Sequence, residues 1–235
     1  MLIGEEGTDR LQNARVLIFG LGGVGSYTAE ALARSGVGHF RLVDADTVAE
    51  SNLNRQLIAT RDTLGMLKTD ADAARIRSLR PDAQIETYPV FYGPDAGDAV
   101  PWDDVDYAVD AVDTVTAKLF IIEQARRHGV PVISSMGTGN KMDPSRLRIA
   151  SIRDTRIDPL ARVMRRELRR RGMEDVPVVY SEEEPLRPLF DPAGPETIKK
   201  PPGSTAFVPG AAGLLIASRV VSDLAQPREI ATSGR

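Results

Sequence analysis

The chain has 235 residues, 42% of them hydrophobic and 27% charged, and its formal net charge is −3 at pH 7. These values are ordinary for one soluble α/β domain, and the mildly acidic balance excludes a global positive field for holding nucleic acid. The absence of cysteine excludes disulfides, cysteine-ligated zinc, an enzyme thioester and a persulfide.

No targeting or membrane segment is indicated. The first ten residues, MLIGEEGTDR, lack the basic start and the apolar run of a secretory signal. The longest apolar run, Ala206 to Ala217, is short for a bilayer and is interrupted by Pro209. We therefore expect a cytoplasmic protein without a membrane partner.

The first strong motif, RVLIFGLGGVGS, runs from Arg15 to Ser26. It reads as an apolar strand, a glycine-rich turn and the start of a helix that stops at Gly36. Such a turn lets backbone N–H groups and the positive end of the helix meet phosphate. The turn fits the G-x-G-x-x-G fingerprint, and the predicted nucleotide-binding glycines are Gly20, Gly22, Gly23 and Gly25.

A second strand, HFRLVDAD, ends in two aspartates and is followed by SNLNRQ (residues 51–56). Asp44 stands where a ribose-binding acid belongs in a Rossmann-type unit. A dinucleotide dehydrogenase would have no use for the arginine and the amides that follow, whereas a nucleoside triphosphate would. The motif therefore predicts an ATP site, in which Arg55 and Lys68 neutralise phosphates and Asn52 supplies an amide. By spacing alone, a solvated lysine at a helix start is the favoured interpretation of Lys68.

Two carboxylates are candidate magnesium ligands. Asp46 and Asp113 each follow a predicted strand, and magnesium takes one or two carboxylates together with phosphate and water. The alternative for Asp113 is a helix cap. Asp110, inside the strand end, is interpreted as structural.

The remaining elements of the first part alternate between strand and helix. We expect a helix over 66–79, strands over 84–90 and 106–112, a helix over 117–129, and a strand over 131–135 with a glycine-bearing loop after it. This alternation predicts a Rossmann-like, doubly wound, mainly parallel α/β sheet with ligands at the carboxyl ends of its strands. Asp44, Asp46, Asp113 and the 137–139 loop all fall at those ends.

Beyond Pro144 the pattern changes to two further strands that flank an arginine-rich helix. Asp158 is suited to cap this helix, Pro159 to its first turn, and Gly172 to its end. Only Glu167 offers a countercharge within the run. A solvated face is one interpretation; the other is contact with an RNA backbone through Arg162, Arg165, Arg166, Arg169, Arg170 and Arg171.

The proline-rich, charged stretch 182–204 is predicted to be a mobile loop or lid. The small residues of 209–217 permit a close helix approach. We interpret the chain as one domain, 1–235, with a nucleotide-binding part over 1–143 and a part for substrate contact and dimerisation over 144–235.

Together, the glycine turn, Asp44, Asp46, SNLNRQ, Lys68 and Asp113 resemble the adenylating superfamily of ubiquitin-activating enzymes and thiamine and molybdopterin adenylyltransferases. Within it, the chain is similar to the tRNA threonylcarbamoyladenosine dehydratases. The segments that carry this similarity are LIGEEG, AEALARSGVG, VDAVDTVTAK, ISSMGTGNKMDP, DPLARVMRRELRRRG, VVYSEEEP and PGSTAFVPGAAGLLIAS.

The resemblance implies an ATP- and magnesium-dependent enzyme, a homodimer, that converts a carboxylate of modified tRNA into an acyl-adenylate. It implies catalytic roles for Arg55, Lys68 and Asp113. The substrate then closes a ring upon itself, and an intramolecular attack of this kind has an effective molarity on the order of 10⁵ M or more. A chain without cysteine can therefore perform the reaction.

One departure and two alternatives remain. The family usually carries an arginine-bearing segment just before LIGEEG, which this sequence lacks, and the position of Arg10 does not match it. The first alternative is adenylation of the Gly-Gly tail of a sulfur-carrier protein, and the missing cysteine weighs against it. The second is a non-catalytic nucleotide-binding module, against which the presence of Lys68 and Asp113 weighs.

Overall fold

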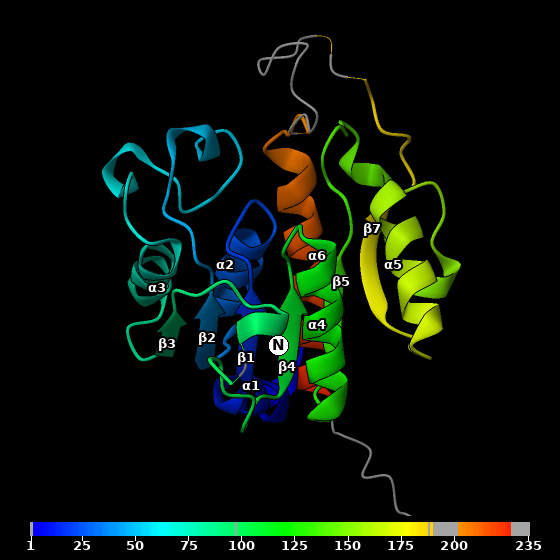
Figure 1. Ribbon diagram of the computed structural model, residues 1–235. Coiled ribbons are helices and arrows are strands. Elements are labelled where there is room, and N and C mark those ends of the chain that lie inside the picture. The colour runs from blue at the N-terminus through cyan, green and yellow to red at the C-terminus, as the bar shows by residue number, and fades with distance from the viewer. Residues whose placement is uncertain (1, 97, 188, 190–201, 227–235) are drawn as a thin grey trace, which may run out of the picture.

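Seven strands form one sheet in a computed structural model that describes residues 2–96, 98–187, 189 and 202–226 (Figure 1). In chain order the helices and strands are α1 (Gly4–Asn13), β1 (Arg15–Phe19), α2 (Gly25–Ser35), β2 (His39–Val43), α3 (Lys68–Leu79), β3 (Gln84–Tyr88), β4 (Tyr107–Asp110), α4 (Val115–Arg127), β5 (Val132–Ser135), β6 (Leu147–Ser151), α5 (Pro159–Arg170), β7 (Pro177–Ser181) and α6 (Phe207–Ala225).

The strand order is β3-β2-β1-β4-β5-β7-β6, and every neighbouring pair is parallel except β6 with β7. The order reverses direction at β1, so the chain is doubly wound and the edge between β1 and β4 is the point where such folds bind ligands. The predicted Rossmann-like α/β fold with additional C-terminal strands is confirmed.

Alternate residues of each central strand enter different cores. In β1, Val16 and Ile18 pack into the core that includes α2, α3 and α6, whereas Leu17 and Phe19 pack into the core beneath α4. Such two-sided burial explains why the strand reads as a continuous apolar run rather than an alternating one. The helices thus form two layers around the sheet (Figure 1).

The small residues of α6 serve packing within the chain. A Cβ on Gly213 would lie 2.4 Å from the backbone oxygen of Val24 in α2, so only glycine allows this approach. Thr28 Oγ1 donates a hydrogen bond to Gly213 O at 3.1 Å. The close approach predicted from the small residues is therefore made to α2 of the same chain.

Pro209 does not interrupt α6, contrary to the sequence interpretation. It lies in the first turn, where backbone N–H groups have no partner in the helix and proline is tolerated. At 19 residues, α6 is the one helix among the described residues that is long and apolar enough to cross a membrane, and half of its apolar window is buried inside the protein. The packing against α2 makes it a core helix.

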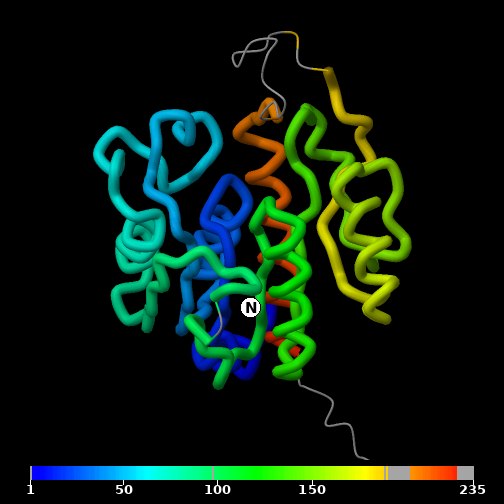
Figure 2. Tube along the Cα trace, in the orientation of Figure 1, coloured from blue at the N-terminus to red at the C-terminus, as the bar shows by residue number. Residues whose placement is uncertain are grey.

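Helix α1, which the sequence analysis did not predict, packs against α6 at the end of the sheet opposite the strand carboxyl ends (Figures 1 and 2). Arg10 donates two hydrogen bonds to Ala225 O, at 3.0 and 2.6 Å. A cation that holds the last turn of α6 at this end of the molecule cannot serve the nucleotide site of its own chain. The structure therefore agrees with the sequence interpretation that the position of Arg10 does not match that of the family's arginine.

Most of the proposed mobile loop, 188 and 190–201, lies outside the described residues. Its two described ends meet at Asn140. Leu186 N donates to Asn140 O at 2.7 Å, and Asn140 exchanges two hydrogen bonds of 2.7 Å with the backbone of Gly203. Asn54 then donates to Ser204 O at 3.2 Å, which joins this junction to the SNLNRQ segment.

Candidate active site

The carboxyl ends of the three central strands are joined by backbone hydrogen bonds. Gly20 N donates to Val43 O at 2.8 Å, and Ala111 N donates to Phe19 O at 2.8 Å. The segments that follow β1, β2 and β4 therefore emerge side by side at one end of the sheet, as Figure 2 shows. These are the segments that carry the predicted glycines, Asp44 and Asp113.

The glycine turn is closed tightly against the segment after β4. Gly20 has a φ of +84°, and a Cβ there would lie 2.8 Å from Ala111 O. A Cβ on Gly25 would overlap Gly20 O, at 1.8 Å. At Gly22 the nearest atom to an added Cβ is 3.8 Å away, which leaves that part of the turn open. A Cβ on Gly23 would lie 3.2 Å from Pro209 Cβ and 3.4 Å from Arg55 Cγ. The SNLNRQ segment and the start of α6 therefore pack against this side of the glycine turn.

Asp44 is held by the backbone of this turn. Its Oδ2 accepts from Leu21 N at 2.7 Å, and its Oδ1 accepts from Asp46 N at 2.9 Å. The side chain is 10% exposed. Each carboxylate oxygen keeps a lone pair, so two further hydrogen bonds from a pair of hydroxyl groups are available.

Lys68 is a buried ammonium rather than a solvated one. It is the first residue of α3, its side chain is 7% exposed, and Nζ lies 2.6 Å from Asp46 Oδ2 and 3.8 Å from Asp44 Oδ1. Its backbone N–H donates to Asp46 O at 3.0 Å. The solvated alternative for Lys68 is therefore wrong, and the structure brings Lys68, Asp44 and Asp46 together beside the glycine turn.

The SNLNRQ segment shapes the other wall. Asn52 is buried, and its Oδ1 accepts from Ala49 N at 3.0 Å, so this amide oxygen closes the turn on itself. Arg55 is partly buried and donates to Ser51 O at 2.7 Å and to Asn54 Oδ1 at 2.8 Å. No carboxylate pairs with Arg55 among the described residues, so its charge is available to an anion.

Asp113 is exposed and lightly bound. Thr114 Oγ1 donates to its Oδ1 at 3.3 Å. Thr114, not Asp113, occupies the cap position of α4, and no side chain makes a cap hydrogen bond there. The helix-cap alternative for Asp113 is therefore wrong. Asp110, by contrast, is fully buried and paired with Lys118 at 2.9 Å, which agrees with its structural interpretation.

The two candidate magnesium ligands differ in how far their carboxylate oxygens are already occupied by other groups. Asp113 has no ion-pair partner among the described residues and accepts only the long hydrogen bond from Thr114, whereas one oxygen of Asp46 is already engaged by Lys68. The described residues contain no group of three or more histidine, cysteine or acidic side chains that could hold a metal by themselves. The site therefore fits magnesium only with phosphate and water as additional ligands, which is the usual manner of magnesium binding.

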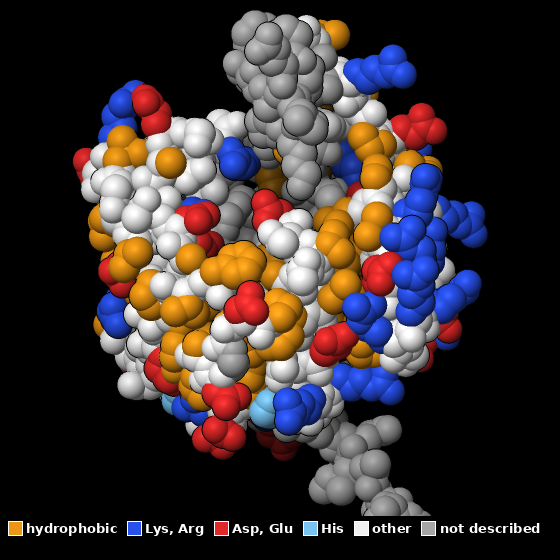
Figure 3. Space-filling view, viewed as in Figure 1, with side chains coloured by type: hydrophobic (Ala, Val, Ile, Leu, Met, Phe, Trp, Pro, Cys, Tyr) orange, Lys and Arg blue, Asp and Glu red, His pale blue; other side chains and the backbone are white. Residues whose placement is uncertain are grey.

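The arginine helix, α5, is capped as predicted: Asp158 Oδ1 accepts from Ala161 N at 2.8 Å. Figure 3 shows basic side chains gathered over this helix. Countercharges are more numerous than the sequence indicated, because Glu123 from α4 pairs with Arg171 at 2.6 Å and Glu174 pairs with Arg169 at 2.6 Å.

Glu167 is the centre of a further cluster on α5. It pairs with Arg166, Arg170 and Arg171 at 3.1–3.2 Å, and the hydrogen bonds from Arg171 and Arg166 lower the pKa of its carboxyl. Arg165 turns inward and donates to Thr155 O and Oγ1. Arg162 is exposed and has no ion-pair partner among the described residues.

Sequence reasoning missed a buried clamp beside α5. Lys141 and Asp158 are buried and lie 2.5 Å apart, and Lys141 Nζ also donates to Gly137 O at 2.7 Å. Glu183 accepts from the backbone N–H groups of Met142 and Asp143 at 2.9 Å. These contacts hold the loop after β5 in place. Its glycines signalled a turn, but nothing local signalled the pairing of residues 17 positions apart.

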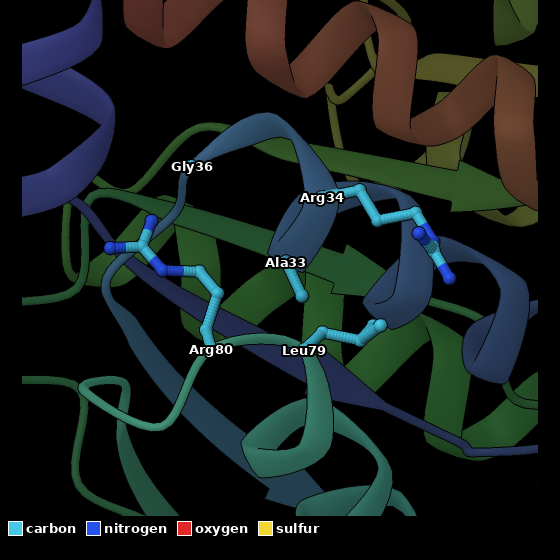
Figure 4. Close-up of a pocket in the computed structure, with 5 residues that line it drawn as sticks. All are labelled: Ala33, Arg34, Gly36, Leu79 and Arg80. Carbon is cyan, nitrogen blue, oxygen red and sulfur yellow. The ribbon is translucent and has the colours of Figure 1, made fainter.

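One surface pocket lies away from this site. It is lined by residues at the C-terminal ends of α2 and α3: Ala33, Arg34, Gly36, Leu79 and Arg80 (Figure 4). Arg34 pairs with Glu30 at 2.7 Å and Arg80 with Asp82 at 2.8 Å, so both guanidinium groups are already engaged. The pocket lies at the end opposite the strand carboxyl ends and contributes nothing to the candidate site.

Comparisons with known proteins place the chain in a family. A model of the ThiF family matches residues 1–234. The chain belongs to the ThiF family. The family resemblance inferred from the motifs is thereby confirmed.

Individual members sharpen this placement. The chain is 41% identical to the tRNA threonylcarbamoyladenosine dehydratase of Bacillus subtilis over 239 residues, which cover 98% of this chain and 94% of that protein. Crystal structures of Escherichia coli tRNA N6-threonylcarbamoyladenosine dehydratase in complex with AMP and with ATP superpose with TM-scores of 0.86 and 0.85, at 31% identity, covering 95% of this chain and 90% of theirs. An adenylyltransferase and sulfurtransferase of Vanderwaltozyma polyspora is 37% identical over 59% of this chain and 31% of its own length.

Proposed function

We propose that this ThiF-family chain is an ATP-dependent tRNA threonylcarbamoyladenosine dehydratase. The observation that carries the proposal is the conjunction of a charged nucleotide site with a chain that has no cysteine. Asp44, Lys68 and the glycine turn form one cluster, and the side chain of Arg55 packs against the turn at Gly23. The near full-length similarity to dehydratases of this kind supports the choice of substrate.

In the proposed reaction, the free carboxylate of the threonylcarbamoyl group attacks the α-phosphorus of ATP, and pyrophosphate leaves. A nucleophilic group of the same substituent then attacks the activated carbonyl carbon and gives up its proton, the bond from that carbon to the AMP oxygen breaks, AMP leaves, and the ring closes. The modified nucleoside has lost one water, whose oxygen departs on AMP. No enzyme nucleophile is needed, which agrees with a cysteine-free chain.

The residues of the site take separate parts in this scheme. Asp44 accepts hydrogen bonds from the ribose hydroxyls, and the amides of the glycine turn donate to phosphate. Lys68 and Arg55 offset the negative charge that moves onto the leaving pyrophosphate. Asn52 holds the SNLNRQ segment in its conformation by accepting from Ala49 N. Asp113, with Asp46, would hold magnesium, which when bound polarises the phosphate oxygens.

We assign nucleotide activation to residues 1–143 and substrate contact to residues 144–235. The arginines of α5 are proposed to meet the tRNA backbone, through the exposed side chains of Arg162, Arg166, Arg169 and Arg170. A homodimer is proposed as well, supported by the exposed apolar side chains Phe207 (47% exposed) and Leu214 (52% exposed) on the outer face of α6. Light scattering at micromolar concentration should give twice the 25.5 kDa chain mass.

The deciding experiment is digestion and mass spectrometry of threonylcarbamoylated tRNA after incubation with the protein, ATP and magnesium. Loss of one water from the modified nucleoside, with one AMP formed per event, is the expected result. Unmodified tRNA is the control. Unchanged nucleoside mass together with tight ATP binding would instead indicate a non-catalytic module.

A second candidate function, adenylation of a sulfur-carrier protein with a Gly-Gly tail, is favoured only by the partial similarity to the adenylyltransferase and sulfurtransferase noted above. ATP–pyrophosphate exchange distinguishes the two. Exchange that depends on such a carrier protein and not on modified tRNA would replace the dehydratase proposal.

A further inference from the structure

Three side chains that the proposed reaction does not use form a fully buried polar cluster around Val112, the residue that precedes Asp113. Asp110 ends β4, Ser134 lies on the adjacent strand β5, and Lys118 lies in the first turns of α4. Each is 0% exposed.

The contacts within the cluster converge on one residue, Val112. Lys118 Nζ lies 2.9 Å from Asp110 Oδ2, and Ser134 Oγ donates to the same oxygen at 2.5 Å. Lys118 Nζ also donates to Val112 O at 3.0 Å, and Val112 N donates to Asp110 Oδ1 at 3.3 Å. Both backbone polar groups of Val112 are thus bonded to one buried ion pair.

This arrangement controls where the next residue begins. The carbonyl of Val112 belongs to the peptide group that joins Val112 to Asp113. Because that group is planar, a fixed carbonyl also fixes the orientation of the Asp113 backbone nitrogen. Asp113 itself has one weak hydrogen bond, at 3.3 Å from its neighbour Thr114. The position of its carboxylate therefore depends on its backbone, and its backbone depends on the cluster.

The energetics favour a positioning role over a stabilising one. Two fully buried charges lose their hydration, and replacing such pairs by apolar residues is often neutral or stabilising. An apolar pair at Asp110 and Lys118 would leave the N–H and the carbonyl of Val112 without these partners. The specific gain from the charges is the orientation of that peptide.

We propose that Lys118, held by Asp110 and Ser134, is a positioning residue that sets Asp113 to receive magnesium bound to ATP. The inference rests on the proposed function, because it assumes that Asp113 meets the metal. Metal-binding side chains are commonly oriented by the groups behind them, and loss of such a group costs about 10- to 100-fold in metal affinity or activity.

The test compares ATP affinity with magnesium and with a chelator, by calorimetry on the full chain. The quantity compared is the magnesium ratio, defined as the Kd for ATP with the chelator divided by the Kd with magnesium. In the wild type this ratio should be well above one. Lys118→Met keeps the length of the side chain and removes the ammonium, and it should reduce that ratio about 10-fold. Ser134→Ala, which keeps the ion pair and removes one hydrogen bond, should reduce the ratio by less, in the same direction.

Lys141→Met is the matched control, because it breaks the other buried lysine–aspartate pair, on the loop after β5. It should lower thermal stability and leave the magnesium ratio at the wild-type value. If the Lys118→Met chain does not fold, Ser134→Ala decides the question.

An unchanged ratio in the folded variants overturns the inference, and so does an equal loss in Lys141→Met. The proposed function is judged by a different result. A wild type that binds ATP with magnesium but removes no water from modified tRNA defeats the dehydratase proposal and leaves this test intact.

Discussion

The strand carboxyl ends and the surface of α5 both concentrate charged side chains, but they hold them in different ways. At the strand ends, Asp44 is bonded to two backbone N–H groups and Lys68 is buried between two carboxylates. On α5 the arginines are mostly exposed, and their partners are exposed or half-buried glutamates. The first arrangement is prepared for one ligand geometry, whereas the second can exchange partners.

The magnitudes support this distinction. Exposed ion pairs contribute little net stability because solvent screens them, so a phosphate can displace Glu167 or Glu174 from an arginine at little cost. A buried ammonium that loses its partner costs several times more. We therefore expect changes at the strand ends to alter turnover, and changes on α5 to alter tRNA affinity in a salt-dependent way.

The largest expected effect concerns turnover. Lys68→Ala, Arg55→Ala and Asp113→Asn should each lower the dehydration rate by about 10²-fold or more, because each removes charge that stabilises the leaving pyrophosphate or its metal. Initial rates with saturating modified tRNA measure the effect, and circular dichroism checks the fold. Arg61→Ala, at an exposed arginine in the connection between β2 and α3, is the control and should keep the wild-type rate. Near-normal rates in all three variants would show that the site is misplaced.

The sequence predicted the parts of this site that local patterns determine. The glycine turn follows from spacing, since Gly20 and Gly25 lie where a Cβ would clash with backbone. The cap of α5 by Asp158 follows from the Asp-Pro pair at its start. The doubly wound sheet follows from the alternation of strand and helix.

The parts that long-range packing determines were missed. Whether Lys68 is solvated or buried depends on the segment after β2 folding back on it, which no local pattern reveals. The countercharges Glu123 and Glu174 reach α5 from outside its own run. The small residues of α6 fit either a neighbouring helix or a second subunit, and in the structure they meet α2.

The next effect concerns tRNA affinity. Replacing Arg162, Arg166 and Arg170 by glutamine should weaken tRNA binding and lower the slope of log affinity against log salt by roughly one unit per lost phosphate contact. Arg165 is left in place because it holds Thr155. Gel-shift titrations at several salt concentrations measure the slope, with ATP affinity unchanged.

A matched pair of single variants sharpens this result. Arg162 on α5 and Arg77 on α3 are both exposed and have no ion-pair partner among the described residues. Arg162→Gln should lower the salt slope, and Arg77→Gln should not. Equal slopes in the two variants would mean that α5 is only a solvated face.

The smallest expected effect is on stability and concerns Asp72 on α3. Unlike Asp44 and Lys68, this buried acid has no hydrogen-bond partner. Asp72 is fully buried, and neither of its carboxylate oxygens has a hydrogen-bond partner. Burial, together with the nearby charges of Glu30 and Asp44 and against the attraction of Arg75, raises the pKa of Asp72 well above its usual value.

The direction of the pH dependence follows from this raised pKa. Between the unfolded value, about 3.9, and the higher folded value, the native chain holds a proton that the unfolded chain has lost, so the free energy of unfolding falls as pH rises through that window. Asp72→Asn stays neutral and should be more stable than the wild type at pH 8, by on the order of 1 kcal/mol, with the difference shrinking towards pH 4. Denaturant unfolding at both pH values measures it, and Asp70→Asn, an exposed neighbour on the same helix, should show no such gain. A stability difference between wild type and Asp72→Asn that does not change with pH would mean that Asp72 keeps its ordinary ionisation.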